Sequence, residues 1–213
     1  MTEGQSVSRP ASAAKRVRLS PEERRRQLIT LGTRMLRERE LEDISVSEIA
    51  KQAGISRALL FHYFPTKQDF YLAVVAHANA ELLARTAPDP DLNMLDMLRD
   101  SITRYVDYVS ENRTSYRALL RGPASAIPEL IAMVDAHRGA QVERILANSP
   151  LPIEDAELPG LTLAVRGWIA FLEETTLIWL REEPIPRDEL IELLVESLPS
   201  LALTPRLAAA LLD

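Results

Sequence analysis

Residues 45–64 read SVSEIAKQAGISRALLFHYF, and this stretch determines the expected fold of the N-terminal region. Ser45 and Glu48 have the spacing of a capping box, so a short helix is expected to begin after Ser45. Gly54 can adopt the left-handed backbone of a tight turn and would end that helix. Ser56 can cap a second short helix directly after the turn. The pattern predicts two short helices joined by a tight turn.

The second of these helices has one apolar and one polar flank. Leu60 and Phe64 are expected to pack inward against Ile49 and Ala50, while the other flank offers donors that can reach phosphates and base edges. This layout is typical of a helix-turn-helix, whose second helix enters the major groove of double-stranded DNA. The candidate DNA-binding residues are Ser45, Ser47, Ser56, Arg57, Ala58, Leu59, His62, Tyr63, Thr66 and Lys67.

A further helix is expected to begin at once, because Thr66 and Asp69 form a second capping pair. Its free N–H groups and the Lys67 ammonium would then lie beside the DNA backbone. The alternative is an ordinary helical hairpin with a solvated basic face, since short helix-turn-helix patterns also arise by chance.

The charge distribution favours the DNA-binding alternative. Residues 1–67 contain 13 Lys and Arg against 8 Asp and Glu, whereas residues 68–213 contain 12 against 23. This asymmetry indicates a polyanion-binding module joined to a different unit. We expect a disordered basic arm at 1–19, a helix-turn-helix domain at 20–66 and a C-terminal ligand-binding and dimerisation domain at 67–213.

Apolar residues recur at helical spacing along the rest of the chain, so an all-α fold is expected, with a three-helix head and a larger helical body. The chain has no cysteine, which excludes disulfides, and no apolar run of the roughly 20 residues that a membrane span needs, so a cytoplasmic protein is expected. The three histidines lack metal-binding spacing, and no glycine-rich phosphate loop or G-x-S-x-G elbow is present. We therefore expect no metal, no cofactor and no enzymatic activity.

Residues 160–182 form the most apolar of the expected helices. Because this helix is apolar nearly all round, it must be covered on more than one side, by its own subunit and by a partner. The alternative is a central core helix of a monomer. One of Glu173 and Glu174 is expected to point inward and to need a partner such as Arg166 or a ligand. The candidate dimer-interface residues are Leu163, Gly167, Ala170, Leu190 and Leu194.

The stretch GISRALLFHYFPTKQDF, residues 54–70, resembles the signature of the TetR family of bacterial transcriptional regulators, and the resemblance covers about 20–75. The sequence departs from the family at Phe61, where a phosphate-donating Tyr is usual. The resemblance implies a homodimer with two DNA-binding heads, an interface from the last two long helices and a ligand cavity in the body. The matching residues are Gly54, Ser56, Tyr63, Phe64, Pro65, Lys67 and Phe70.

The expected function is that of a repressor released from a palindromic operator by a small apolar or aromatic effector of drug-like size. We place the effector between the helix that begins at Thr66 and helix 160–182, among aromatic and polarisable side chains with few polar tips. Two alternatives stay open, a constitutive dimeric DNA-binding protein and an enzyme that acts on an apolar small molecule. The candidate pocket residues are Tyr105, Tyr108, Tyr116, Met133, His137, Trp168, Phe171 and Glu174.

Overall fold

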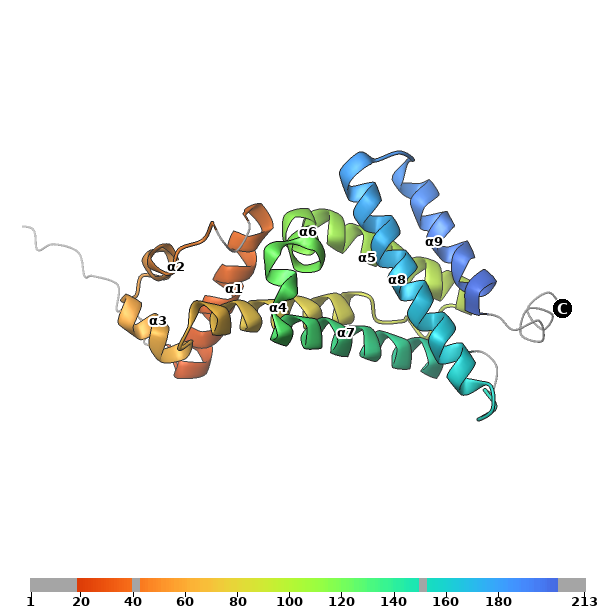
Figure 1. The fold of residues 1–213 in the computed structure, drawn as a ribbon, viewed down its shortest axis with the longest axis horizontal. Coiled ribbons are helices and arrows are strands. Elements are labelled where there is room, and N and C mark those ends of the chain that lie inside the picture. Colours follow the sequence, from red (N-terminus) through yellow and green to blue (C-terminus); the bar gives the residue numbers. More distant parts are fainter. Residues whose placement is uncertain (1–18, 40–42, 150–152, 203–213) are drawn as a thin grey trace, which may run out of the picture.

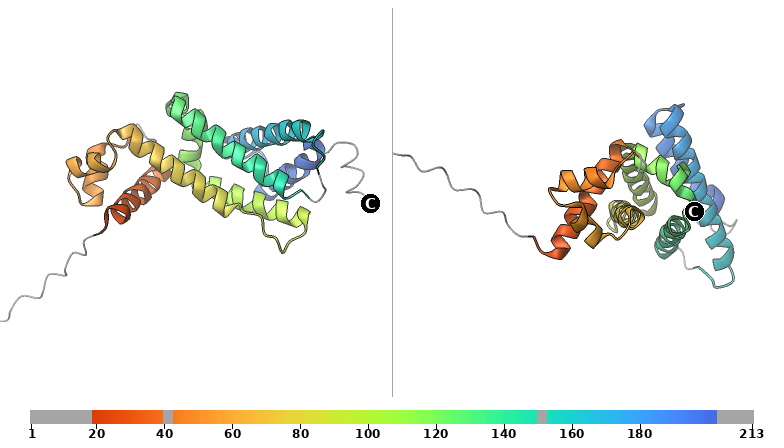
Figure 2. Two further views of the ribbon diagram at one scale, coloured as in Figure 1. Left: turned by 90° about the horizontal axis from the view of Figure 1, so that it is seen from below. Right: turned by 60° about the vertical axis from the view of Figure 1, so that its left-hand side comes forward.

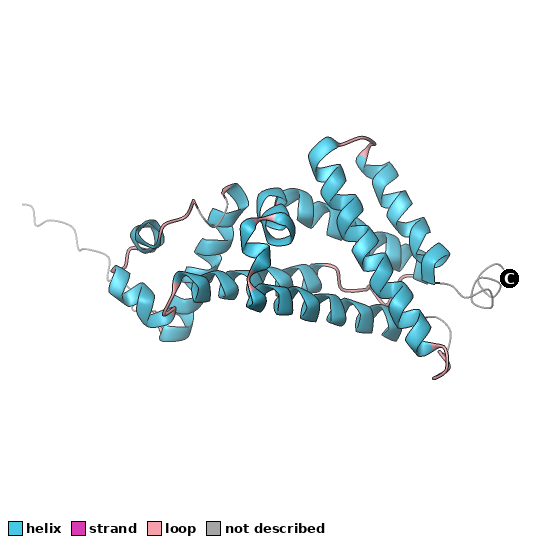
Figure 3. Ribbon diagram, viewed as in Figure 1, coloured by secondary structure: helices cyan, strands magenta, loops and turns pink. Residues whose placement is uncertain are grey.

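The computed structural model describes residues 19–39, 43–149 and 153–202, and all regular elements in these ranges are helices (Figure 3). The all-α prediction is confirmed. In chain order the elements are α1 (Pro21–Glu38), α2 (Val46–Ala53), α3 (Arg57–Tyr63), α4 (Lys67–Arg85), α5 (Met94–Glu111), α6 (Arg113–Arg121), the short 3-10 helix η1 (Pro123–Ala126), α7 (Pro128–Ala147), α8 (Leu158–Glu182) and α9 (Arg187–Ala202).

The first three helices form a head at one end of an elongated molecule (Figure 1). Leu28, Ile49 and Leu60, one from each helix, are fully or almost fully buried in one hydrophobic cluster. The N-terminal half of α4 joins this cluster through Phe70, whose ring meets that of Phe64 edge-on at 5.1 Å between ring centres, and Ala124 and Leu130 also belong to it. The head is therefore held together by the helix that leaves it.

The remaining helices form the body, around a second cluster that includes Val106, Val165 and Leu194. Helices α8 and α9 pack side by side, and α5 packs against α9 (Figure 1). Helix α7 lies along α4, as Figure 2 also shows. Helix α4 contributes Val75 to the head cluster and Leu82 to the body cluster, so one continuous helix joins both parts.

The caps show why the head helices begin where they do. Thr66 and Asp69 form the predicted reciprocal capping box, with both backbone N–H bonds at 3.0 Å. The capping box predicted at Ser45 was wrong in one half. Ser45 Oγ does accept from the Glu48 N–H at 3.1 Å, but the Glu48 carboxylate pairs with Arg39 at 2.6 Å instead of reaching back.

The sequence also led to expectations for the N-terminal arm, for the domain boundary and for membrane-spanning helices. The basic arm expected at 1–19 falls, apart from residue 19, outside the described residues. Helices α4 and α7 each contribute to both hydrophobic clusters, and the domain boundary at 66/67 stays a prediction. Within the described ranges, no helix combines the length and apolar character that crossing a membrane would require.

Candidate nucleic-acid interface and interior cavities

Helix α3 presents the polar flank that the sequence predicted. Leu60 and Phe64 are each 2% exposed, so the inward flank is confirmed. The helix begins at Ser56, whose Oγ accepts the Leu59 N–H at 3.1 Å. On the outer flank Arg57 is exposed. The other candidates on α3 that are also exposed are Ala58, Leu59 and His62, and Tyr63 is half-buried against the head cluster.

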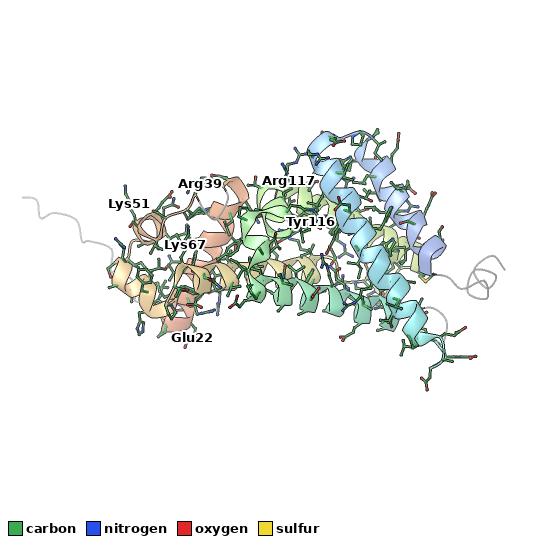
Figure 4. The ribbon with its side chains drawn as sticks, in the orientation of Figure 1. Glu22, Arg39, Lys51, Lys67, Tyr116 and Arg117 are labelled. Atoms are coloured by element: carbon green, nitrogen blue, oxygen red, sulfur yellow. The ribbon has the colours of Figure 1, made fainter. Side chains whose placement is uncertain are left out.

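The remaining candidates of the head frame α3 on either side. Ser45 and Ser47 are exposed at the start of α2, and Thr66 is exposed at the start of α4. Lys67, half-buried, occupies the first position of α4 and lies at the head end of the molecule (Figure 4). The fold thus gathers three helix starts at one end, where free N–H groups and cations favour anions. DNA contact by each of these residues stays a prediction.

The structure adds Arg25 and Lys51 to the candidates and places Phe61, which the sequence had already singled out. Phe61 is 38% exposed on α3, and its apolar ring can contact a thymine methyl but cannot donate to a phosphate. The Arg25 guanidinium lies 5.1 Å from the centre of the Phe64 ring, which places an α1 cation beside the end of α3. Lys51 is exposed on α2, one turn after Ser47 (Figure 4). The i, i+4 spacing of Ser47 and Lys51 was the available signal.

The body contains a cavity of about 190 Å³, lined mainly by apolar side chains of α5, α7, α8 and α9. Of the predicted pocket residues, Tyr105 and Trp168 line it. The Trp168 indole N–H is satisfied by Ser197 Oγ at 2.9 Å, so Trp168 offers the cavity an apolar face. A polar group at this cavity must therefore come from another residue of the lining.

A smaller cavity of about 70 Å³ lies between α1, α4, α5, α6, α7 and α8. Tyr105 also lines this space, together with the predicted residues Tyr108, Tyr116 and His137. The hydroxyls of Tyr105 and Tyr116 share a hydrogen bond of 2.6 Å, and burial raises the pKa of both phenols (Tyr116 is labelled in Figure 4). Both rings are thus neutral donors inside the body.

Three predicted pocket residues line neither cavity. Met133 packs against the head cluster, and Phe171 packs against the body cluster. Glu174 is exposed and pairs with Arg121 on the surface. The inward carboxylate is Glu173, which lines the smaller cavity and is held by the Arg138 guanidinium at 2.6 Å.

His137 is the predicted pocket residue whose pKa the surroundings lower. Burial, followed by the nearby Arg144 and Arg138 charges, lowers the pKa of His137 to about 4. Its Nε2 lies 2.9 Å from the side-chain nitrogen of Gln141, which fits an unprotonated acceptor. In the described ranges, no three His, Cys, Asp or Glu side chains form a group that could hold a metal ion.

The expected dimer-interface residues separate into two sets. On α8, Leu163 is 72% exposed, and Gly167 and Ala170 are exposed on the same side of the helix. On α9, Leu190 and Leu194 are 0% exposed and belong to the body cluster. Including them in an interface was wrong, because a side chain that its own subunit already covers cannot meet a partner.

Comparisons with known proteins agree with this arrangement of head and body. Residues 28–74 match the family model described as bacterial regulatory proteins, tetR family. Residues 94–200 match the model described as tetracyclin repressor-like, C-terminal domain. The chain is also similar to the HTH-type transcriptional activator FasR of Mycolicibacterium smegmatis, with 27% identity over 198 residues that cover 89% of this chain and 88% of FasR.

Solved structures give the same result. A tetR-family transcriptional regulator from Streptomyces coelicolor superposes with a TM-score of 0.76 at 36% identity, over 86% of this chain and 82% of that one. A TetR-like regulator from Rhodococcus sp. RHA1 shares the fold, with a TM-score of 0.63 at 21% identity, over 88% of this chain and 100% of that one. The chain belongs to the TetR family and is a DNA-binding transcriptional regulator.

Proposed function

We propose that the chain acts as a homodimeric repressor that leaves a palindromic operator when a small apolar molecule binds in the body. The observation that carries this proposal is the course of α4. Its first residue, Lys67, adjoins the candidate DNA-binding surface of the head, and its C-cap residue, Thr86, lines the larger cavity. A ligand that displaces the end of α4 therefore acts on the helix that supports α3.

Packing makes α4 suitable for this coupling. At the head end, Phe70 packs on Phe64, the residue that ends α3, so the two helices cannot shift independently. At the body end, Leu82 is 6% exposed within the second cluster. Densely packed interfaces tend to switch between discrete arrangements, which turns a small shift at a ligand into a change of head position.

A dimer is required because a palindrome is read by two heads related by a two-fold axis. The exposed side of α8 is a suitable surface, since Leu163, Gly167 and Ala170 offer an apolar side chain and two small residues to a second copy. A ligand that favours a head separation unlike that of the operator would weaken binding by about 1–3 kcal/mol.

The test is a titration of labelled duplexes from the promoter next to the coding sequence, with and without small apolar compounds, together with a transcription assay. Release of the duplex by a compound and higher transcription support the proposal. Duplex binding that no ligand changes supports the constitutive alternative instead. Lower transcription on release would make the chain an activator, as the name of FasR states for that protein.

An enzyme that acts on an apolar molecule remains the alternative of another class. Our proposal that the chain acts by binding alone predicts that a ligand is recovered unchanged after long incubation with the protein. Chemical conversion of that ligand, abolished by substitution of a cavity residue such as Tyr105, would support the enzyme. Membrane association is not part of the proposal, and a cytoplasmic location stays a prediction.

A further inference from the structure

The larger cavity contains one charged side chain that nothing in the described chain neutralises. Arg144 of α7 lines this cavity, and its guanidinium donates to the Leu83 carbonyl at 2.6 Å and to Thr86 Oγ1 at 2.9 Å. These bonds use two of the five N–H donors that a guanidinium carries. No carboxylate in the described ranges lies within ion-pairing distance of it, whereas the neighbouring Arg104 pairs with Asp100.

The surroundings of Arg144 raise the free energy of its charged form. Burial, followed by the charge of Arg104, lowers the pKa of Arg144, and no acidic group contributes to the shift. Arginine nevertheless stays protonated in proteins. A half-buried cation without a counter-ion is unfavourable unless a partner arrives, because desolvation is then not offset. The cavity therefore has an unfilled requirement for an anion.

The position of Arg144 within the cavity indicates how such an anion would lie. Asn148, one helical turn further along α7, is exposed and also lines the cavity, as does Leu95, which is 55% exposed. The cavity therefore reaches the surface near the end of α7. The opposite wall consists of buried apolar groups of α8, including Trp168 and Leu172.

We propose that the larger cavity binds a small aliphatic carboxylate, with the carboxylate on the Arg144 guanidinium and the hydrocarbon tail against α8. A guanidinium recognises carboxylates through two parallel hydrogen bonds, and a mostly apolar pocket with few orienting groups suits the tail. This inference rests on the proposed function and narrows the effector from an apolar molecule to an acid.

The volume limits the length of the tail. A protein cavity of about 150 Å³ holds benzene, with six carbon atoms. By proportion, the 190 Å³ of this cavity hold about eight non-hydrogen atoms. Hexanoate has eight such atoms. The part of the ligand that this cavity encloses is accordingly smaller than a drug-sized molecule, whose pockets begin at roughly 300 Å³.

Binding at Arg144 has a direct consequence for α4. The two acceptors that Arg144 now engages, the Leu83 carbonyl and the Thr86 hydroxyl, belong to the end of α4 and to its C-cap residue. A cation at helix C-terminal carbonyls stabilises that end of the helix. A carboxylate on the remaining N–H donors draws the guanidinium towards itself and weakens these bonds, so ligand binding should loosen the end of α4.

The experiment is calorimetric titration of the purified full-length protein with hexanoate and with hexanamide, its uncharged isostere. We expect hexanoate to bind at least about tenfold more tightly, because it forms charge-assisted hydrogen bonds and offsets a buried charge. Equal affinity for the two compounds would overturn the inference. So would a clear preference for the amide.

Variants locate the site. Arg144→Met should reduce hexanoate affinity at least about tenfold and leave hexanamide affinity almost unchanged, whereas Arg144→Lys should retain part of the preference for the acid. Arg99→Met is the matched control, since Arg99 is exposed on the same body and lines no described cavity. Loss of hexanoate binding in the Arg99 variant but not in the Arg144 variant contradicts the assignment.

Ser101→Phe tests where the hydrocarbon tail of the ligand lies, without changing the charge of the cavity. Ser101 lines the cavity on α5, and a phenyl ring there would fill the space while Arg144 is kept. Both compounds should then bind weakly, with circular dichroism confirming an intact fold. Wild-type hexanoate affinity in this variant would overturn the location. If hexanoate binds as described but leaves operator affinity unchanged, the ligand site stands and the proposed release of the repressor fails.

Discussion

At the scale of single residues, two cations of the head occupy similar positions and should act differently on DNA. Arg57 is exposed on the outer flank of α3, while Lys67 begins α4. Arg57→Ala should cost about 1–3 kcal/mol on the preferred duplex and relax base preference, if the guanidinium reads a base edge. Lys67→Ala should weaken all duplexes similarly and reduce the salt slope by about one, since phosphate contacts carry no sequence information.

Both effects are measured by fluorescence anisotropy on specific and scrambled duplexes at several salt concentrations. Tyr63→Phe belongs to the same series and should behave like Lys67→Ala if the phenol donates to a phosphate. Arg121→Ala, a substitution of an exposed body cation, is the control for total charge. Head variants that bind every duplex like the wild type would contradict the assignment of α3.

His137 predicts a pH dependence of folding. Its pKa is lowered to about 4, so between that value and the ordinary 6.5 the unfolded chain binds more protons than the folded one. Stability should therefore rise with pH across this window and fall on acidification, by at most about 1.4 kcal/mol per pH unit. Urea unfolding from pH 4 to 7 measures this slope. It should become shallower in His137→Gln, and an unchanged slope would contradict the burial of a neutral ring.

Neighbouring residues on a helix show what the sequence could not decide. Glu173 and Glu174 both interrupt an apolar run, so one inward carboxylate was predictable. Successive side chains of a helix point about 100° apart, and the choice between them depends on the partner. That partner is Arg138, which lies 35 positions earlier and is brought to Glu173 only by the packing of α7 on α8.

At the scale of elements, the helices were predictable because capping residues and apolar periodicity are local signals. The head candidates came together for the same reason, since 45–67 is one short continuous stretch. Leu190 and Leu194 lie four positions apart and so share one face of α9, but an apolar face looks the same in the sequence whether its own subunit or a partner covers it. Both leucines turned out to lie in the body cluster.

Whether a leucine of the body is covered by its own subunit or by a partner can be measured. Leu163→Glu places a charge on the exposed side of α8 and should shift the protein towards the monomer while the free energy of unfolding changes little. Leu194→Ala removes a fully buried side chain and should lower the free energy of unfolding by about 2–5 kcal/mol. Sedimentation and urea titration of both variants separate the roles. A monomeric but stable Leu194 variant would reverse our assignment.

Helices α1 and α4 pack tightly at Gly32. A Cβ there would lie 2.6 Å from Phe70 Cζ and 2.6 Å from Val74 Cγ2, and both neighbours are buried. Gly32→Ala should lower the free energy of unfolding by about 1–2 kcal/mol, since overpacking exceeds the helix-propensity gain. Gly139→Ala on α7, where a Cβ meets nothing within 4 Å, should instead raise it by up to about 1 kcal/mol. Thermal unfolding compares the two.

At the scale of the whole molecule, the head contacts the body along α4, at the far end of α1, and where Ala124 of η1 and Leu130 of α7 enter the head cluster. Two of these contacts concern the ligand signal. Helix α4 is one, and it carries the connection from the Arg144 cavity. The other lies at the far end of α1, where Arg37 Nε donates to Asn112 Oδ1 at 2.9 Å. Asn112 is 3% exposed, donates to the Tyr108 carbonyl at 2.7 Å and lines the smaller cavity. A rotation of the head about α4 must either break the hydrogen bond between Arg37 and Asn112 or move Asn112 together with the head.

Arg37→Met therefore tests whether the contact between Arg37 and Asn112 transmits a ligand signal. Coupling is reciprocal, so the factor by which a ligand lowers operator affinity must equal the factor by which operator lowers ligand affinity, typically about 5-fold to 150-fold. The variant should keep both separate affinities and show a smaller factor, because a head that has lost this hydrogen bond follows the body less closely. Arg34→Met, one turn earlier and exposed, should keep the wild-type factor. Titrations of ligand with and without operator measure this factor, and an unchanged factor in Arg37→Met would show that the Arg37–Asn112 contact does not transmit the signal.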